Sequence, residues 1–460
     1  MRWDVANDPL IADPSFIVDV ATLPVEGAVA IPPWPGWYWP TASDSINARW
    51  NPVAPSAAEK VELAFGIPGF ADAVSKAYGV LSCSHLPVCA IDSQCAAGER
   101  CTRRAGAWLG SPGHCIPEWW GIDHGWAAAA ILEPAPISAV QRAGHTFEVH
   151  DIKALLTLMY AGSLPIKFVG RRSNGAVTAV DLRGRPLDPI DRDIDPGALH
   201  LIIANQVGLK GQSVVVDLQI NNLVWNQPVR SFRVTNAIEG QLLEITESMA
   251  ARALGLDVAF QVVLGPTLLA HDERRSGSFT ALVDGDFVVG TSGTGDVDLY
   301  VKIGGPASEN DADRAGRGDD SFERCRLHAT AGSVIHWTAI GYQSNSCVQV
   351  WIGVPTGVPA TYTANPDASR FFLVDLDLRW VTNADPAATP RPIDDYTRTL
   401  PLRYVLEADS AGAIIGGEWI GESLRYHPDF LWWPQSLPQN KSFGGLTYDT
   451  VRALLLESVA

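Results

Sequence analysis

Three residues of this sequence, Asp123, His200 and Asp217, have the types and spacing that could support catalysis. His200 and Asp217 fall in two segments rich in strand-forming residues, within residues 196–228, joined by a short glycine-containing turn. Paired as a hairpin, these segments place His200 opposite or diagonal to Asp217 on one face, within hydrogen-bonding reach. A histidine oriented by a carboxylate is a common general base for a nucleophile held elsewhere in the chain.

Asp123 stands where that nucleophile would be expected. The stretch GIDHGWAAAAIL predicts a helix that begins near Asp123, because a glycine turn leads into alanines and apolar residues. A helix N-terminus favours negative charge and lowers the pKa of a thiol, so it suits a cysteine nucleophile. A simpler interpretation is that Asp123 caps the helix, since Asp is a preferred N-cap residue. By the same reasoning His124 is a first-turn helix residue.

The elements that must position these residues divide the chain into three zones. Residues 1–270 mix helical patterns, such as residues 150–162, with strand pairs. Residues 271–354 consist of short alternating strands with Gly and Asp turns, which predicts an inserted all-β module. Residues 355–460 return to the first texture, with a strand at RFFLVDLDLRW and a hairpin at LRYVLEADSAGAIIGGEWI. At 460 residues, two or three domains are expected.

Composition limits the partners. The net charge is −17, which argues against nucleic acid or anionic lipid as the main partner. No apolar run is long enough for a membrane helix, and the first residues lack the basic-then-apolar pattern of a signal peptide.

The cysteines indicate an oxidising compartment. Five of the seven lie in one Gly- and Ser-rich segment, residues 83–115, which favours a disulfide framework over a zinc site because no CxxC pair is present. We expect two bridges among four of them, a third bridge between Cys325 and Cys347, and an unpaired Cys83. The four are Cys89, Cys95, Cys101 and Cys115.

Five ordered motifs carry a family resemblance: WPGWYWPTASDSINARWN, CIPEWWGIDHGWAAAAILEPAP, PGALHLIIANQVG, VWNQPVRSFRV and GAIIGGEWIGESLRYHPDFLWWP. Together they resemble the transglutaminase elicitor family of oomycete plant pathogens and its bacterial relatives. The resemblance implies an α+β, papain-like, secreted acyltransferase that crosslinks a glutamine side chain to an amine through a cysteine thioester, with dependence on Ca²⁺. The segment GTGDVDLYVKIGG resembles bacterial pre-peptidase C-terminal domains, which are β-sandwich modules of secreted enzymes.

The family motif breaks at one position. It reads G-I-C-H-x-W, and this chain has Asp123 in place of the nucleophilic cysteine, while His200, Asp217 and Trp225 match the expected base, carboxylate and aromatic residue. An aspartate that attacked a glutamine amide would form a mixed anhydride, which is much higher in energy than a thioester. Cys115 is a poor substitute, since it matches a disulfide cysteine of the family.

Three functions therefore compete on sequence grounds. The first is aminoacyl transfer to protein or peptide partners that carry glutamine and amine groups. The second is a hydrolase or other general acid/base enzyme that uses Asp123 with His200. His427 and Asp429 form a rival His/Asp pair, although a turn is the simpler interpretation of that segment. The third is a non-catalytic binding or recognition protein, in which the β module and the VWNQPVRSFRV segment, predicted to be an exposed loop, carry the recognition. We expect an extracellular protein in each case.

Overall fold

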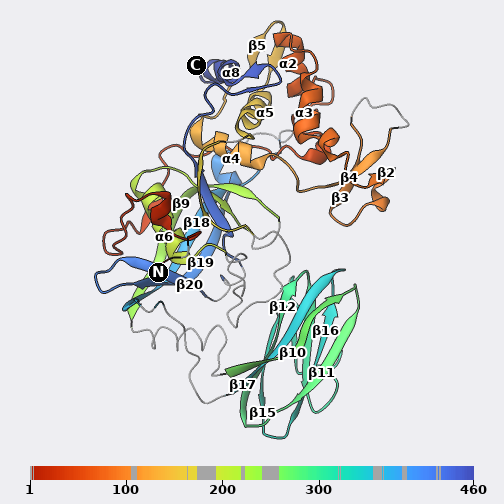
Figure 1. The fold of residues 1–460 in the computed structure, drawn as a ribbon, viewed down its shortest axis with the longest axis vertical. Helices are drawn as coiled ribbons and strands as arrows, with labels where there is room; N and C mark the ends of the chain where they lie inside the picture. Colours follow the sequence, from red (N-terminus) through yellow and green to blue (C-terminus); the bar gives the residue numbers. More distant parts are fainter. Residues whose placement is uncertain are drawn as a thin grey trace.

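A computed structural model describes most of the chain. The described residues are 3, 5–104, 111–162, 164–172, 193–218, 223–240, 258–319, 321, 323–355, 365, 367–385, 391–420, 423 and 426–460. They form a mixed α+β fold with one large antiparallel sheet and several small ones (Figure 1). No helix in these ranges is long and apolar enough to cross a membrane.

The large sheet has eight strands in the order β20-β19-β18-β9-β8-β21-β7, with β1 paired to β9. Strands far apart in the sequence therefore lie side by side at its centre, where β8 pairs with both β9 and β21. The strand bounds are β1 Glu26–Ala28, β7 Ile166–Gly170, β8 Val215–Asp217, β9 Asn226–Gly240, β18 Arg370–Val381, β19 Thr397–Ala408, β20 Ile414–Trp419 and β21 Phe430–Pro434. The predicted strand at 370–380 and hairpin at 402–420 are confirmed as β18, β19 and β20.

Two hydrophobic cores cover opposite faces of this sheet. Along β8, Val215 packs into the first core and Val216 into the second, as the alternation of side chains along a strand requires. Strand β21 alternates in the same way, with Trp432 in the first core and Trp433 in the second. Residues on one face of the sheet are thus separated by the sheet itself from residues on the other.

The first core is mainly helical. Its helices are α2 Ala57–Phe65, α3 Phe70–Tyr78, α4 Asp123–Leu132, α5 Val149–Tyr160 and α8 Tyr448–Val459, which gather at the upper end of the molecule in Figure 1. Helix α4 begins at Asp123 and α5 covers residues 149–160, so both predicted helices are confirmed. The alanines of α4 let it pack closely against α5.

The second core contains α1 Pro9–Ala12 and α6 Pro196–Ile203, which packs on β19 and β20. The prediction of a β-hairpin over residues 196–228 is wrong in its first half, because residues 196–203 form α6 and Ala204–Leu209 continue it as a π-helical turn. Asp195 caps α6 by accepting hydrogen bonds from the backbone N–H groups of Gly197 and Ala198. The helix is buried on all sides, so its sequence is apolar throughout and lacks the amphipathic pattern that separates helix from strand.

The all-β segment forms two four-stranded sheets around a shared core, separate from the two cores of the large sheet (Figure 1). The first has the order β10-β17-β12-β15 and the second β11-β16-β13-β14. Because β10 pairs with β17, the first sheet begins at Val258, before the predicted boundary at residue 271. Their bounds are β10 Val258–Leu269, β11 Arg274–Thr280, β12 Gly285–Thr294, β13 Val297–Ile303, β14 Arg314–Gly316, β15 Arg324–Ala329, β16 Val334–Gly341 and β17 Ser346–Pro355.

The cysteine-rich segment forms a small sheet in the order β2-β4-β3, from β2 Val88–Cys89, β3 Glu99–Thr102 and β4 Gly113–Pro117. Disulfides join Cys89 to Cys101 and Cys95 to Cys115, and Cys83 is unpaired, as predicted. The sheet leads directly into α4, since β4 ends shortly before Asp123.

The predicted bridge between Cys325 and Cys347 is wrong, because both cysteines are free. They lie on β15 and β17, on either side of β12, where Cys325 is opposite Val289 and Cys347 opposite Thr294. Neighbouring strands lie about 4.8 Å apart. Two strands of separation plus this offset exceed the limit of roughly 7 Å between the Cα atoms of a disulfide.

The remaining short elements connect these layers. They are β5 Val140–Arg142, β6 His145–Phe147, β22 Ser442–Phe443, β23 Leu446–Thr447 and the short helical turns η1 Thr41–Ser43, η2 Ser45–Asn47, η3 Val80–Cys83, η4 Asp92–Gln94 and η7 Ile393–Tyr396.

Candidate functional site

Asp123 is the first residue of α4 and is almost fully buried, at 8 % exposure. Its Oδ2 accepts hydrogen bonds from the backbone N–H of Asn226 (2.8 Å) and from the Asn226 side-chain amide (3.2 Å). Its Oδ1 accepts from the backbone N–H of His124 (2.9 Å). The N-cap position itself is Ile122, so Asp123 does not cap the helix in the usual way and instead ties its start to β9.

Asn226 is the residue that joins this carboxylate to the sheet. It is the first residue of β9 and is paired with Asp217 at the end of β8. Its side-chain oxygen accepts a hydrogen bond from the indole N–H of Trp432 on β21 (2.8 Å). Asn226 therefore donates to Asp123 and accepts from Trp432, and both of its side-chain roles are used.

Asp217 lies on the same face of the sheet as Asp123. It is two residues from Val215 on β8, so its side chain has the direction of the first core, and it is completely buried. Its Oδ1 accepts from the backbone N–H of Trp225 (3.1 Å), and the Trp225 ring lies edge-on to Tyr38. The structure thus brings two of the three predicted residues, Asp123 and Asp217, to one site on either side of Asn226.

His200 lies on the opposite face. It belongs to α6 in the second core, and its Nδ1 is 2.7 Å from the hydroxyl of Tyr404 on β19. The predicted cross-strand pairing of His200 with Asp217 is therefore wrong, since His200 is on a helix and the sheet separates it from the Asp123 face. Burial lowers the pKa of His200 to about 4, so the imidazole is neutral at physiological pH.

The titratable side chain beside Asp123 is His124. Its Nδ1 lies 3.9 Å from Asp123 Oδ1, and its Nε2 is 2.9 Å from the carbonyl oxygen of Ala161, just beyond α5. If that ring nitrogen carries the proton, Nε2–H donates to Ala161 and Nδ1 faces the carboxyl group. The sequence indicated only a first-turn residue here.

The rival pair, His427 and Asp429, is organised differently from a catalytic dyad. His427 contacts Asp193 through Nε2 (3.0 Å) and the carbonyl oxygen of Ser423 through Nδ1 (2.6 Å), and it stacks on Trp419 of the second core. Burial lowers its pKa to about 4. The backbone N–H of Asp429 donates to the carbonyl oxygen of Asp217. Cys115, the alternative thiol, is held in a disulfide.

The surroundings of Asp123 make its ionisation less favourable than that of an exposed aspartate. Burial raises the pKa of its carboxyl group, and the hydrogen bonds from Asn226 and the nearby His124 only partly oppose that shift. A buried carboxyl group with its oxygens engaged in hydrogen bonds is a weak nucleophile towards an amide. The arrangement can hold α4 on the sheet, but position 123 carries no thiol, and the histidine beside it is the partly exposed His124.

Calcium has little support from the described residues. The one group of three potential metal-ligating side chains found among them is Cys89, Cys95 and Cys115. Calcium is bound by oxygen ligands, so this sulfur group does not fit it.

Sequence reasoning missed Asn226 as a site residue. It also predicted that VWNQPVRSFRV is an exposed loop, which is wrong, because residues 226–229 are buried in β9 at the centre of the sheet. The available signal was the position of Asn226 directly after Trp225 in a motif already matched to the family. A buried Asn at the start of a strand needs a partner for its amide, and Asp123 provides it.

Comparisons with known proteins place this geometry in context. No curated protein sequence matches the chain. The crystal structure of the GP42 transglutaminase from Phytophthora sojae is similar over 98 % of this chain and 98 % of that chain, with a TM-score of 0.65 and 28 % identity. The chain thus has a mixed α+β fold like that of the GP42 transglutaminase. A solution structure named vEP C-ter 100 aligns with 21 % of this chain and 94 % of that chain at 26 % identity, but the TM-score is 0.17 and we base no argument on it.

A family model described as transglutaminase elicitor matches residues 11–253 and 357–460. The match stops where the two four-stranded sheets begin and resumes after them. It spans both cores of the large sheet and the cysteine-rich sheet. The chain belongs to the transglutaminase elicitor family.

Proposed function

We propose that this chain is a secreted, papain-like member of the family that has kept the scaffold of a glutamine–amine crosslinking protein but has lost thioester chemistry. The observation that carries the proposal is the environment of Asp123. The carboxyl group occupies the start of the helix where the family motif has cysteine, and Asn226 binds it from the sheet. The remaining function is recognition of protein or peptide partners that carry glutamine or amine groups.

Two features support the papain-like and secreted parts of the proposal. Helix α4 packs with its first turn against β9 and β21 of an antiparallel sheet, which is how a papain-like scaffold holds a nucleophile at a helix start. Two disulfides in one short segment suit an oxidising compartment. Calcium dependence is proposed from the family resemblance alone. An equal melting temperature in the presence of a chelator and in the presence of calcium would contradict it.

The hydrolase alternative is less well supported. It requires Asp123 and His200 to share a substrate, yet α4 and α6 lie on opposite faces of the large sheet. His200 also engages Tyr404 and is kept neutral by burial.

The test restores the missing thiol. Asp123→Cys should raise incorporation of a labelled amine into a glutamine-rich protein above the native level, and a thiol-blocking reagent should remove the gain. Asp123→Ser is the matched control, because it has similar size and no thiol. If Asp123→Cys and Asp123→Ser incorporate the labelled amine equally, position 123 does not lie at an acyl-transfer site. The proposal that this position once held the nucleophile is then wrong.

Recognition is tested separately. We expect the native chain and Asp123→Ser to bind a glutamine-rich protein with equal affinity in a calorimetric titration, since neither needs a thiol to bind. Absence of binding by both would contradict the recognition role.

A further inference from the structure

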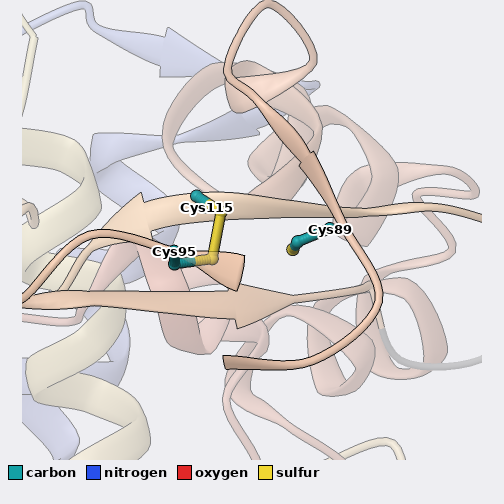
Figure 2. Close-up of side chains that lie close together, drawn as sticks. All are labelled: Cys89, Cys95 and Cys115. Atoms are coloured by element: carbon teal, nitrogen blue, oxygen red, sulfur yellow. A yellow bond between two sulfur atoms is a disulfide. The ribbon is translucent and has the colours of Figure 1, made fainter. Parts of the chain in front are cut away.

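The two disulfides of the cysteine-rich sheet are packed into one sulfur cluster. The sulfur atoms of Cys89, Cys95 and Cys115 all lie within 4.8 Å of one another, although Cys89 is bonded to Cys101. Figure 2 shows Cys89 beside the bridge that joins Cys95 to Cys115. The Cys89 sulfur of one bridge therefore lies close to both sulfur atoms of the Cys95–Cys115 bridge.

Gly113 makes this packing possible. It lies opposite Cys89 on β2, and a Cβ atom at this position would stand 2.9 Å from the sulfur of Cys101 and 3.2 Å from that of Cys89. Any side chain there would collide with the bridge. Cys115 follows two residues later on β4 and has the same side-chain direction, which brings its sulfur to the cluster.

Burial distinguishes the ends of the bridges. Cys89 and Cys115 are buried, at 4 % and 2 % exposure, whereas Cys101 and Cys95 are partly exposed. An external thiolate therefore reaches Cys101 more easily than Cys89. The guanidinium of Arg103 donates a hydrogen bond to the carbonyl oxygen of Ala90, the neighbour of Cys89, and so holds a positive charge close to the backbone at this end of the bridge.

From this arrangement we propose that the two bridges form a thiol–disulfide exchange relay, in which a reducing dithiol opens Cys89–Cys101 and the released Cys89 then opens Cys95–Cys115. The relay is independent of the proposed function of Asp123.

Each step of the relay balances. In the first, the thiolate of the dithiol attacks Cys101 Sγ, the bond to Cys89 breaks, and Cys89 leaves as a thiolate. The second thiol of the dithiol resolves the mixed disulfide, so that the dithiol becomes a cyclic disulfide and Cys101 a thiol.

In the following step the Cys89 thiolate attacks Cys115 Sγ. The bond between Cys95 and Cys115 breaks, and Cys95 leaves as a thiolate that takes a proton from water. Attack on Cys115 is favoured over attack on Cys95, because it leaves the charge on the more exposed cysteine. The product is a buried Cys89–Cys115 bridge with free thiols at Cys95 and Cys101.

Two single variants of the full chain test the relay. Cys101→Ser leaves Cys89 as a thiol inside the cluster, and Cys89→Ser leaves Cys101, whose sulfur is outside the group of three. Both proteins are alkylated without reduction, digested and mapped by mass spectrometry. In Cys101→Ser we expect most molecules to carry a new bridge from Cys89 to Cys115, with the label on the released Cys95.

The matched variant should differ. In Cys89→Ser we expect the original Cys95–Cys115 bridge in at least nine molecules of ten, with the label on Cys101. The relay is overturned if Cys101→Ser also keeps that bridge and carries the label on Cys89. If either variant fails to fold, the native protein is instead treated briefly with limiting dithiothreitol and alkylated. Label on Cys89 and Cys101 alone would also overturn the relay.

Discussion

The two faces of the large sheet hold the two residues that sequence reasoning joined into one site. On one face Asp123 begins α4 and is bound by Asn226; on the other His200 lies within α6 and contacts Tyr404. Both side chains are buried, and burial disfavours the charged form of each. It raises the pKa of Asp123 and lowers the pKa of His200. The two residues nevertheless have no common solvent-facing space, because the sheet lies between them.

A residue can thus match a family motif in sequence while its side chain lies away from the site that the motif implies. His200 matches the family motif in sequence, but its hydrogen bond goes to a tyrosine of its own core. Asp123 replaces the cysteine of the motif, and Asn226 donates hydrogen bonds to its carboxyl group. The comparison therefore predicts that changes on the Asp123 face and on the His200 face have different consequences for stability.

The largest effect is expected from Asn226→Leu. This change removes the hydrogen bond from the side-chain amide to the buried Asp123 and the acceptor of the Trp432 indole N–H. The backbone N–H of residue 226 can still donate, so we expect a loss of roughly 3 kcal/mol in the free energy of unfolding. Urea denaturation measures it.

Gln227→Leu is the control on the adjacent residue, whose side chain has the opposite direction. It should cost less than about 1 kcal/mol, because no contact of Asp123 is altered. Equal losses for the two variants would show that Asn226 is an ordinary strand residue and not the support of Asp123.

His200→Leu should change the pH dependence of stability. The pKa of His200 is lowered to about 4 in the folded protein and is about 6.5 when unfolded, so the unfolded chain binds a proton first as the pH falls. Stability from this group is complete above pH 6.5 and is lost as the pH falls towards 4. Between pH 7 and pH 5 the native protein should lose about 2 kcal/mol that the variant does not lose.

The measurement is the free energy of unfolding at each pH for both proteins. His427, whose pKa is also lowered to about 4, contributes a similar slope that both proteins share. Parallel curves for the native protein and His200→Leu would mean that His200 titrates normally and is not enclosed in the second core.

The smallest effect is expected from Asp123→Asn. Burial raises the pKa of Asp123, and an amide of the same shape can still accept from Asn226. We expect a loss of less than about 1 kcal/mol near pH 5. A carboxyl group with a raised pKa loses its contribution as the pH rises through that pKa, so the variant should become relatively more stable at high pH. A large loss at all pH values would instead indicate an ionised, strongly bound Asp123.

The sequence predicted the elements whose signals are local. Helix α4 was placed at Asp123 by its glycine turn and alanines, and the pairing of four cysteines into two bridges followed from their density. Helix α6 was mistaken for a strand because an element buried on every side has no periodic polar face. The Cys325–Cys347 bridge failed because strand order cannot be read from strand-like sequence alone.

The site itself was predicted in part. Asp123 and Asp217 do lie on one face, as the family motifs implied. Their connection through Asn226 depends on β8 and β9 meeting at their ends, which is set by long-range pairing. The separation of His200 from them likewise depends on which face α6 covers, and no local pattern contains that information.

Incorporation of a labelled amine into a glutamine-rich protein by the native chain tests the central claim most directly. We expect incorporation at the level of a blank without protein, with calcium or without it, because Asp123 is a buried carboxyl group held by Asn226 and not a thiol. Incorporation well above the blank that disappears in Asp123→Ala and persists after thiol blocking would contradict the claim, since Asp123 itself would then be carrying out the transfer.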